Sequence, residues 1–245
     1  MARVAGQKEI VNWCRDNDIW YLQMDIEIPE ACIAEAQAVY DEGFFVNHRG
    51  SDGEGWLSAG IHSFVHKDEE STDLGWRHTK NPSGHGMTEE EVIWGYTEIA
   101  EIAPETKRWL EEFPHKHYRR CRFMLLAPNG YIEQHHDSNE PRDRRGDRRN
   151  IASAINLAFY QPLGNCHLSR IHEDGSREAL PFKNCTGFWF DNGVEHEAKN
   201  ETKENRFHFI MHGAGNNHRI DLMKKSIVKT YGNDALKEIE ASAQL

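Results

Sequence analysis

Two short segments of this chain carry residues that could bind a metal ion together. In residues 131–137 (YIEQHHD), His135 and Asp137 are separated by one residue. If this segment is a strand, both side chains point to one face and His136 points to the other. A later His would complete a set of two His and one carboxylate, and the segment FDNGVEHEAKN offers His196 for that place. Such a facial triad, with three coordination positions left open, is typical of non-haem iron(II) oxygenases.

Arg206 follows ten residues after His196 and opens the apolar segment RFHFIMHG. If the chain turns and returns as an antiparallel strand, Arg206 comes back beside His196. A buried guanidinium needs an anionic partner, because the burial of an unpaired charge is costly. Its planar fork fits a carboxylate through two parallel hydrogen bonds. The spacing therefore predicts an iron(II) site whose open positions take a keto acid and dioxygen, with Arg206 binding the C5 carboxylate of 2-oxoglutarate.

Simpler explanations apply to the same residues. A His-x-Asp pair can be incidental in a chain with 15 His residues, and Arg206 could pair with an ordinary carboxylate of the protein. A zinc hydrolase would instead use Glu133 or Glu195 as a general base and would not need Arg206. A metal-containing jelly roll could also bind or sense a small acid without turnover.

Candidate substrate-binding residues lie in two polar segments. The segment 139–150 (NEPRDRRGDRRN) carries five arginines, of which Arg148 or Arg149 could hold a substrate carboxylate, although the whole segment could equally be a solvated loop. Trp76 lies in the long polar segment 66–86, which we interpret either as a lid that closes over the substrate or as a mobile loop. Trp76 would serve the lid as a substrate contact or would simply be a core residue.

The elements that would hold these residues change in type along the chain. Before residue 114 the apolar spacing predicts helices at 7–16, 30–42, 88–101 and from 104, with strands within 19–28 and 56–65. Later β-prone segments are short and separated by turn residues, at 122–127, 131–137, 151–160, 166–172, 186–191, 196–199 and 206–212. The tail from residue 221 is helical again. This order indicates a sandwich or a jelly-roll barrel rather than a parallel sheet.

Composition narrows the class of protein. A chain of 245 residues with 38% hydrophobic residues is long enough for one large domain. The net charge of -11 disfavours a nucleic-acid partner. No apolar run approaches the roughly 20 residues of a membrane span, and the first residues lack the pattern of a signal peptide, so we expect a cytoplasmic protein without a membrane partner. Five cysteines without a CxxC pair indicate reduced thiols, which agrees with iron(II) chemistry.

Three segments together resemble a known family. RFMLLAPNGYIEQHHD, FWFDNGVEHE and RFHFIMHG look like the aspartyl/asparaginyl β-hydroxylase family of 2-oxoglutarate oxygenases, whose wider group includes bacterial proline hydroxylases. The resemblance covers residues 120–213, and its most specific element is FDN-x-x-x-H followed by Arg206 at plus ten. It implies a double-stranded β-helix, iron bound by the triad and 2-oxoglutarate anchored by Arg206. The animal hydroxylases that name the family lack the carboxylate ligand, whereas this chain has Asp137 and resembles the proline-hydroxylase branch there.

We therefore predict a mainly β fold with flanking helices, a double-stranded β-helix of the jelly-roll, cupin-like kind. Residues 1–245 would form a single oxygenase domain, with N-terminal helices and edge strands in 1–117, a jelly-roll core with the metal site in 118–213 and a helical segment in 214–245. The predicted activity is iron(II)- and 2-oxoglutarate-dependent hydroxylation of an unactivated carbon, with release of succinate and CO2. The substrate would be an amino acid, an amino-acid-derived small molecule or a peptidyl residue, and we favour a small molecule. The oligomeric state is open.

Overall fold

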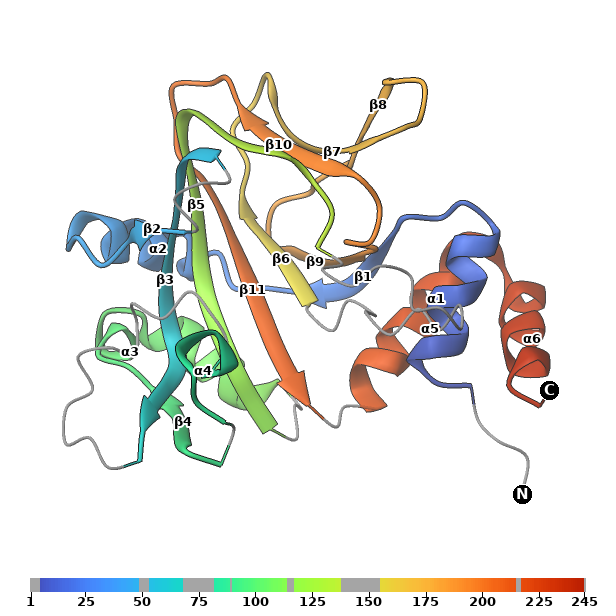
Figure 1. The fold of residues 1–245 in the computed structure, drawn as a ribbon, viewed down its shortest axis with the longest axis horizontal. Helices are drawn as coiled ribbons and strands as arrows, with labels where there is room; N and C mark the ends of the chain where they lie inside the picture. The colour runs from blue at the N-terminus through green and yellow to red at the C-terminus, as the bar shows by residue number, and fades with distance from the viewer. Residues whose placement is uncertain are drawn as a thin grey trace.

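The strands of this protein pair into one continuous antiparallel sheet that curls on itself, with helices around it (Figure 1). The computed structural model describes residues 5–48, 53–67, 82–88, 90–113, 117–137, 155–214 and 217–244. The helices are α1 (Gln7–Asp16), α2 (Ala31–Asp41), the 3-10 helix η1 (Pro82–His85), α3 (Ile99–Ile102), α4 (Pro104–Glu112), α5 (Asn217–Tyr231) and α6 (Asn233–Ser242). The strands are β1 (Tyr21–Glu27), β2 (Val46–Asn47), β3 (Gly53–His66), β4 (Val92–Tyr96), β5 (His117–His135), β6 (Ile155–Tyr160), β7 (Cys166–Ile171), β8 (Arg177–Ala179), β9 (Thr186–Phe190), β10 (His196–Asn200) and β11 (Arg206–Ala214).

The curl of the sheet comes from the long strand β5, which bends at residues 127–130 (Figure 1). Within the bend Asn129 adopts a positive φ of 60°. The first half of β5 pairs with β11, and the second half pairs with β10. The strand order is β1-β9-β6-β11-β5-β10-β7-β8, and β3 also runs along β5. Two facing walls result, one around β11 and one around β10, which confirms the predicted double-stranded β-helix with flanking helices.

Strict alternation along the strands gives each wall an outer and an inner face. On β11, Phe207 and Phe209 belong to the large apolar core that also takes in side chains of the helices. Phe209 stacks on Phe159 of β6, with ring centroids 5.4 Å apart. The intervening residues Arg206 and His208 line the space between the walls instead. The helices therefore cover the outer face and leave the inner face to the functional site.

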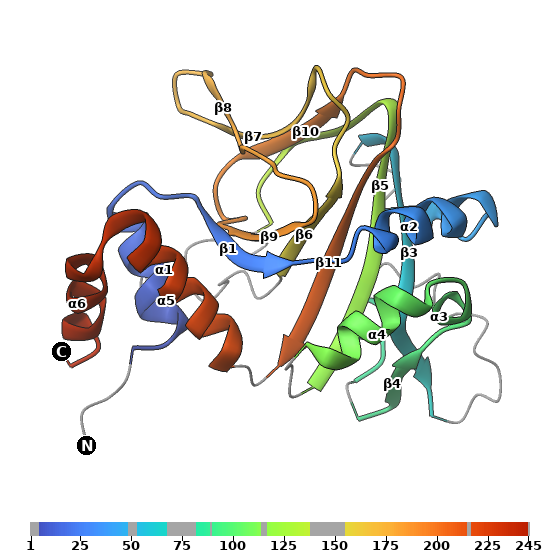
Figure 2. The same cartoon turned by 180° about the vertical axis from the view of Figure 1, so that it is seen from behind.

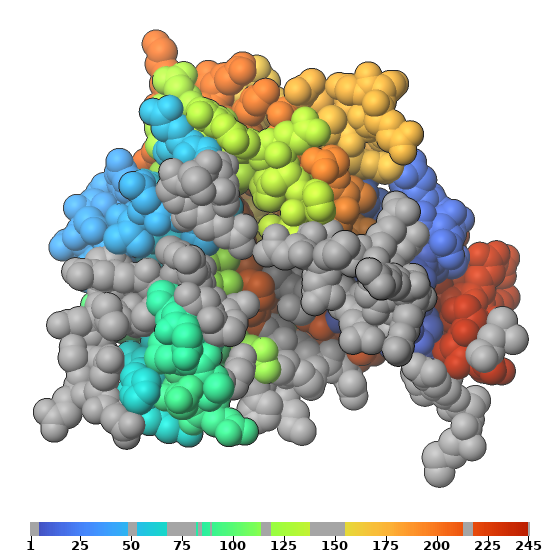
Figure 3. All heavy atoms as spheres, viewed as in Figure 1, coloured from blue at the N-terminus to red at the C-terminus, as the bar shows by residue number. Residues whose placement is uncertain are grey.

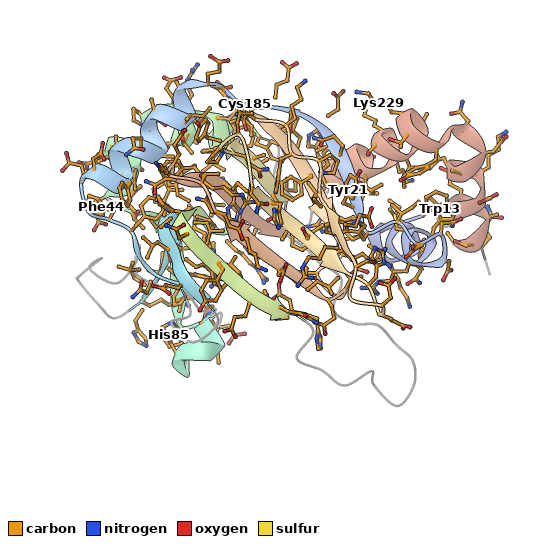
Figure 4. The ribbon with its side chains drawn as sticks, turned by 90° about the horizontal axis from the view of Figure 1, so that it is seen from above. Trp13, Tyr21, Phe44, His85, Cys185 and Lys229 are labelled. Carbon is orange, nitrogen blue, oxygen red and sulfur yellow. The ribbon has the colours of Figure 1, made fainter. Side chains whose placement is uncertain are left out.

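The helices form two groups around the sheet. Figure 2 shows α2 and α4 over the sheet near β5 and β3, whereas α1, α5 and α6 gather beside β1. In the second group, seen from above in Figure 4, Trp13 of α1 lies near the C-terminal helices. Its ring meets Tyr231 edge to face at 5.6 Å, and its Nε1 donates to Glu238 Oε2 at 3.0 Å. The C-terminal segment is thus packed on the N-terminal helix.

Among the described residues, none of the helices combines the length and apolar character that a membrane span requires.

Three sequence-based expectations about secondary structure were wrong. Residues 88–101 were expected to be helical, yet they contain the strand β4 and only then the short helix α3. The expected capping contact exists, since the backbone N of Thr88 donates to Glu91 Oε2 at 2.6 Å, but it closes a turn. The following run VIWGY is rich in β-branched and aromatic residues and pairs with β3, as at Phe64 and Trp94. In addition, the two strands expected at 122–127 and 131–137 are one bent strand, and β8 was not expected at all.

Candidate metal centre

Three potential metal ligands meet between the two walls, near the end of β5 and the start of β10. His135 and His196 are directly opposite each other in the β5–β10 pairing, and their ring centroids are 4.4 Å apart. Asp137 follows two residues after His135, with its Oδ1 3.7 Å from His135 Nε2. One ligand atom from each residue lies within 4.8 Å of the others, and no second group of this kind occurs in the described part of the chain. The fold therefore brings together the three residues predicted from the sequence.

The hydrogen bonds of the two imidazoles prepare them to bind a metal. His135 Nδ1 lies 2.7 Å from the backbone O of Glu133, and His196 Nδ1 lies 2.8 Å from the backbone O of Val194. A carbonyl oxygen only accepts, so each Nδ1 carries the proton and each Nε2 keeps a lone pair. Burial lowers the pKa of His196, which favours the neutral, ligating form. Two neutral imidazoles and one carboxylate fit a divalent metal such as iron(II).

The carboxylate of Asp137 is oriented by Asn192. The backbone N of Asp137 donates to Asn192 O at 2.9 Å, and Asn192 Nδ2 donates to Asp137 Oδ2 at 3.0 Å. Asn192 therefore holds one carboxylate oxygen while Oδ1 faces His135. Asn192 lies in the turn that leads from β9 to β10, so the same turn positions both Asp137 and His196.

This turn is itself fixed from α1. Asp191 is 2% exposed and accepts two hydrogen bonds from Arg15, at 2.5 Å from Nε and 2.7 Å from Nη2. Asp191 Oδ1 also accepts from the backbone N of Gly193 at 3.1 Å. A bidentate ion pair of this kind is geometrically demanding. It ties the N-terminal helix to the segment that precedes His196.

The neighbouring His136 points away from the triad, as the two-residue period of a strand requires. Its Nδ1 lies 2.9 Å from Glu195 Oε1, and the two side chains are 49% and 44% exposed. Glu133 is exposed as well. None of these three residues is among the described residues that line the cavity next to the triad. The sequence-based choice of His135 over His136 therefore agrees with the geometry.

A cavity that is partly open to solvent lies between the walls, and its empty volume, including the part open to solvent, is about 630 Å³. In Figure 3, atoms of β5 and of the segment that includes β10 lie next to each other on the viewed face. The side chain of His135 is 24% exposed and that of Asp137 is 32% exposed, so solvent reaches the triad from outside. The remaining polar lining residues are His48, Arg122, Asn156, Arg206 and His208. The apolar lining residues are Trp56, Ile132, Leu168, Phe188, Phe190, Ala198 and Ile210.

Arg206 lines this cavity from the start of β11, opposite Leu126 and next to the bend of β5. It is 3% exposed, its guanidinium lies over the ring of Phe182 at 4.6 Å, and its Nε donates to Gln161 Oε1 at 3.4 Å. Burial lowers its pKa, and no carboxylate of the described residues forms an ion pair with it. A buried guanidinium held by an aromatic ring and one amide still lacks an anion. The carboxylate of an organic acid would supply it.

The structure does not describe the other candidate residues that were predicted from the sequence. Arg148, Arg149 and Trp76 lie outside the described residues, as does most of the segment 66–86. Conversely, Arg122 lines the cavity but was not among the residues predicted from the sequence. The signal was available, because Arg122 opens the apolar run RFMLLA in the same way as Arg206 opens RFHFIMHG.

The chain is similar to known proteins in sequence and in fold. The family model described as aspartyl/asparaginyl beta-hydroxylase matches residues 63–214, more than half of the chain. No curated relative matches in sequence. Similar solved structures include a Pseudomonas putida prolyl-4-hydroxylase, with 15% identity and a TM-score of 0.40, covering 84% of this chain and 100% of that chain. A Burkholderia pseudomallei oxidoreductase of the 2OG-Fe(II) oxygenase family has 10% identity and a TM-score of 0.45, with coverages of 84% and 89%. A Trichoplax adhaerens prolyl hydroxylase, solved with a peptide fragment of the hypoxia inducible factor oxygen degradation domain, has 13% identity and a TM-score of 0.46, with coverages of 84% and 88%.

Proposed function

Because the chain belongs to the aspartyl/asparaginyl β-hydroxylase family of iron(II)- and 2-oxoglutarate-dependent oxygenases, we propose that it hydroxylates an unactivated carbon and releases succinate and CO2. The substrate is an amino acid, an amino-acid-derived small molecule or a peptidyl residue. One observation carries the proposal: a facial triad and a buried arginine without a described carboxylate partner line the same cavity.

In this proposal each group of the chain has a defined task. His135, Asp137 and His196 hold iron(II), and Arg206 pairs with the C5 carboxylate of 2-oxoglutarate. When bound, iron(II) with 2-oxoglutarate and dioxygen supplies the oxidative decarboxylation that drives attack on a C–H bond. Asn192 keeps one oxygen of the Asp137 carboxylate occupied, so that the other remains directed at the triad.

The charge and shape of the cavity support the same assignment. The guanidinium of Arg206 is already desolvated and oriented by Phe182, so binding a carboxylate there needs little reorganisation. Aromatic side chains such as Phe188 and Phe190 line the region next to His196, where they exclude water. Phe190 also meets the ring of His196 edge to face at 5.3 Å, which restricts the imidazole.

The zinc hydrolase hypothesis has less support from the geometry. It needs a general base aimed at the metal, but Glu195 is engaged by His136 on the exposed side and Glu133 does not line the cavity. It also gives no role to Arg206. A non-catalytic protein that binds a small acid uses the same site as the oxygenase and differs from it only in turnover.

Turnover therefore tests the proposal. Purified protein loaded with iron(II) and 2-oxoglutarate is exposed to oxygen, and succinate is measured by mass spectrometry. We expect succinate from the native protein and from His136→Ala, a control that removes the adjacent, outward-facing imidazole. We expect none above background from Asp137→Ala or Arg206→Met. Iron and 2-oxoglutarate binding without succinate formation would instead support the non-catalytic alternative.

A further inference from the structure

The turn between β9 and β10, residues 191–194, contributes no metal ligand but holds two of the three. The backbone O of Asn192 accepts from Asp137 N at 2.9 Å, and Asn192 Nδ2 donates to Asp137 Oδ2 at 3.0 Å. The backbone O of Val194 accepts from His196 Nδ1 at 2.8 Å. The position of this turn therefore decides where the carboxylate of Asp137 and the ring of His196 point.

The turn has an internal shape of its own, and an ion pair fixes its place. Within it, Asp191 Oδ1 accepts from Gly193 N at 3.1 Å, and Val194 N donates to Asp191 O at 3.2 Å. The same carboxylate accepts from Arg15 of α1, at 2.5 Å from Nε and 2.7 Å from Nη2. A Cβ atom on Gly193 would lie 3.2 Å from Arg15 Nη2, so the turn packs directly on the guanidinium.

The burial of Asp191 makes its position depend on Arg15. Asp191 is 2% exposed, and an ionised carboxylate buried this deeply needs a cation beside it. The planar fork of Arg15 fixes the orientation of the carboxylate as well as its charge. Without Arg15 the carboxylate either binds a proton or turns toward water, and either change releases the restraint on the turn. The C-terminal helices hold α1 from its other side, through contacts of Trp13 with Tyr231 and Glu238.

We propose that Arg15 is a positioning residue of the metal centre, acting through Asp191 on the turn 191–194. In this role it fixes the directions of Asp137 and His196 without touching the metal. The inference rests on the proposed function, because it takes the triad to be the iron(II) site. It gives the N-terminal helix, which carries no ligand, a part in metal binding. Since coupling between two sites is reciprocal, a metal bound at the triad should in turn stabilise α1.

The test measures metal binding rather than turnover. The full chain competes with a fluorescent chelator for iron(II) under anaerobic conditions. Arg15→Met should weaken iron(II) binding about tenfold, the lower end of the range for groups that orient metal ligands. Arg15→Lys keeps a cation but lacks the planar fork, so its affinity should lie between those of the native protein and Arg15→Met.

Two further readouts report on the geometry of the site and on the coupling. The ligand-field absorption of bound cobalt(II) should differ between Arg15→Met and the native protein, because the directions of two ligands change. In the native protein, cobalt(II) should slow hydrogen exchange of the α1 amides. In Arg15→Met this protection should disappear.

Two control variants separate positioning from a general loss of stability. Glu35 accepts three hydrogen bonds at the start of α4, from Glu105 N, Thr106 N and Thr106 Oγ1, each at 2.7 Å. Glu35→Ala should therefore destabilise the other group of helices, which Figure 2 shows away from α1, and keep the native iron(II) affinity and cobalt(II) spectrum. Asp18→Asn weakens an exposed ion pair with Arg170, just after α1, and should also keep both.

Three results would overturn the inference. They are native iron(II) affinity in Arg15→Met, an equal loss of affinity in Glu35→Ala, and the absence of metal-dependent protection of α1 in the native protein. If Arg15→Met does not fold, Arg15→Lys is compared with Glu35→Ala instead, and native affinity in Arg15→Lys would overturn the inference. If the native protein binds no iron(II), the proposed function fails first, and the titration of the native protein alone reveals that separately.

Discussion

Replacing Asn192 by Ala should weaken metal binding about tenfold without unfolding the protein. The substitution removes the 3.0 Å hydrogen bond from Asn192 Nδ2 to Asp137 Oδ2 but keeps the backbone bond from Asp137 N to residue 192. A hydrogen bond to a charged group is worth about 1.5–3 kcal/mol, which corresponds to about 10- to 150-fold in affinity. Because the side chain of Asp137 is 32% exposed, water can replace part of this bond, so we expect the lower end of the range.

The assay is an anaerobic competition between the protein and a fluorescent chelator for iron(II), with thermal unfolding measured in parallel. Gln134→Ala is the matched control, since Gln134 is also an amide close to the ligands, but its Nε2 contacts the outward-facing Glu195 at 3.4 Å. The control should keep the native affinity. Equal affinities for Asn192→Ala and Gln134→Ala would refute the idea that Asn192 orients the carboxylate ligand.

Further expectations concern the buried charges. At 100 times its Kd, bound 2-oxoglutarate should raise the free energy of unfolding of the native protein by about 2.7 kcal/mol. Calorimetric melting with and without 2-oxoglutarate should show that Arg206→Met removes this gain. An undiminished gain would contradict the role of Arg206 as the 2-oxoglutarate anchor. Arg15→Ala leaves the 2% exposed Asp191 without its ion-pair partner. In urea unfolding the variant should lose about 3 kcal/mol of its free energy of unfolding. A loss under about 1 kcal/mol would show that the fold does not depend on the pair. Burial lowers the pKa of His208 in the folded protein. As the pH falls, the unfolded chain therefore binds a proton at this residue before the folded protein does. The contribution of neutral His208 to stability is thus complete above about pH 6.5 and decreases below it. In urea titrations between pH 6 and 5, His208→Leu should reduce that slope by about 1.4 kcal/mol per pH unit, and an unchanged slope would argue against a neutral His208.

The shared face of His135 and Asp137 was predictable because it follows from short-range periodicity. His135 and Asp137 share a face through the two-residue period of a strand, and the same period sends His136 to solvent. The prediction that an antiparallel return brings Arg206 beside His196 was wrong in its detail. β11 pairs with β5 and β6 rather than with β10, so Arg206 lies opposite Leu126, whereas His196 lies opposite His135. The two residues still line the same cavity. The resemblance to the family added the cofactor and the fold class, and the family match supports both.

Features that depend on pairing between distant strands were not predictable from the sequence. Val92–Tyr96 forms a strand because β3 offers an edge there, and no local signal reveals that edge. The bend that unites two expected strands into β5 depends on β10 and β11 pairing with its two halves. For the same reason the sequence could not say which side of its strand faces the cavity at His208, since a shift of one residue in register would reverse it.

We propose above that one cavity holds iron(II) at His135, Asp137 and His196 and 2-oxoglutarate at Arg206. The most direct measurement is an anaerobic titration of the metal-free protein with iron(II) and then 2-oxoglutarate, followed by visible absorption for the charge-transfer band of the bound keto acid. We expect the band to saturate in the native protein and to be lost in Asp137→Ala. In Arg206→Met we expect the band to be lost or to need far more 2-oxoglutarate. A native-like band in both variants, or no band in folded, iron-loaded native protein, would contradict it.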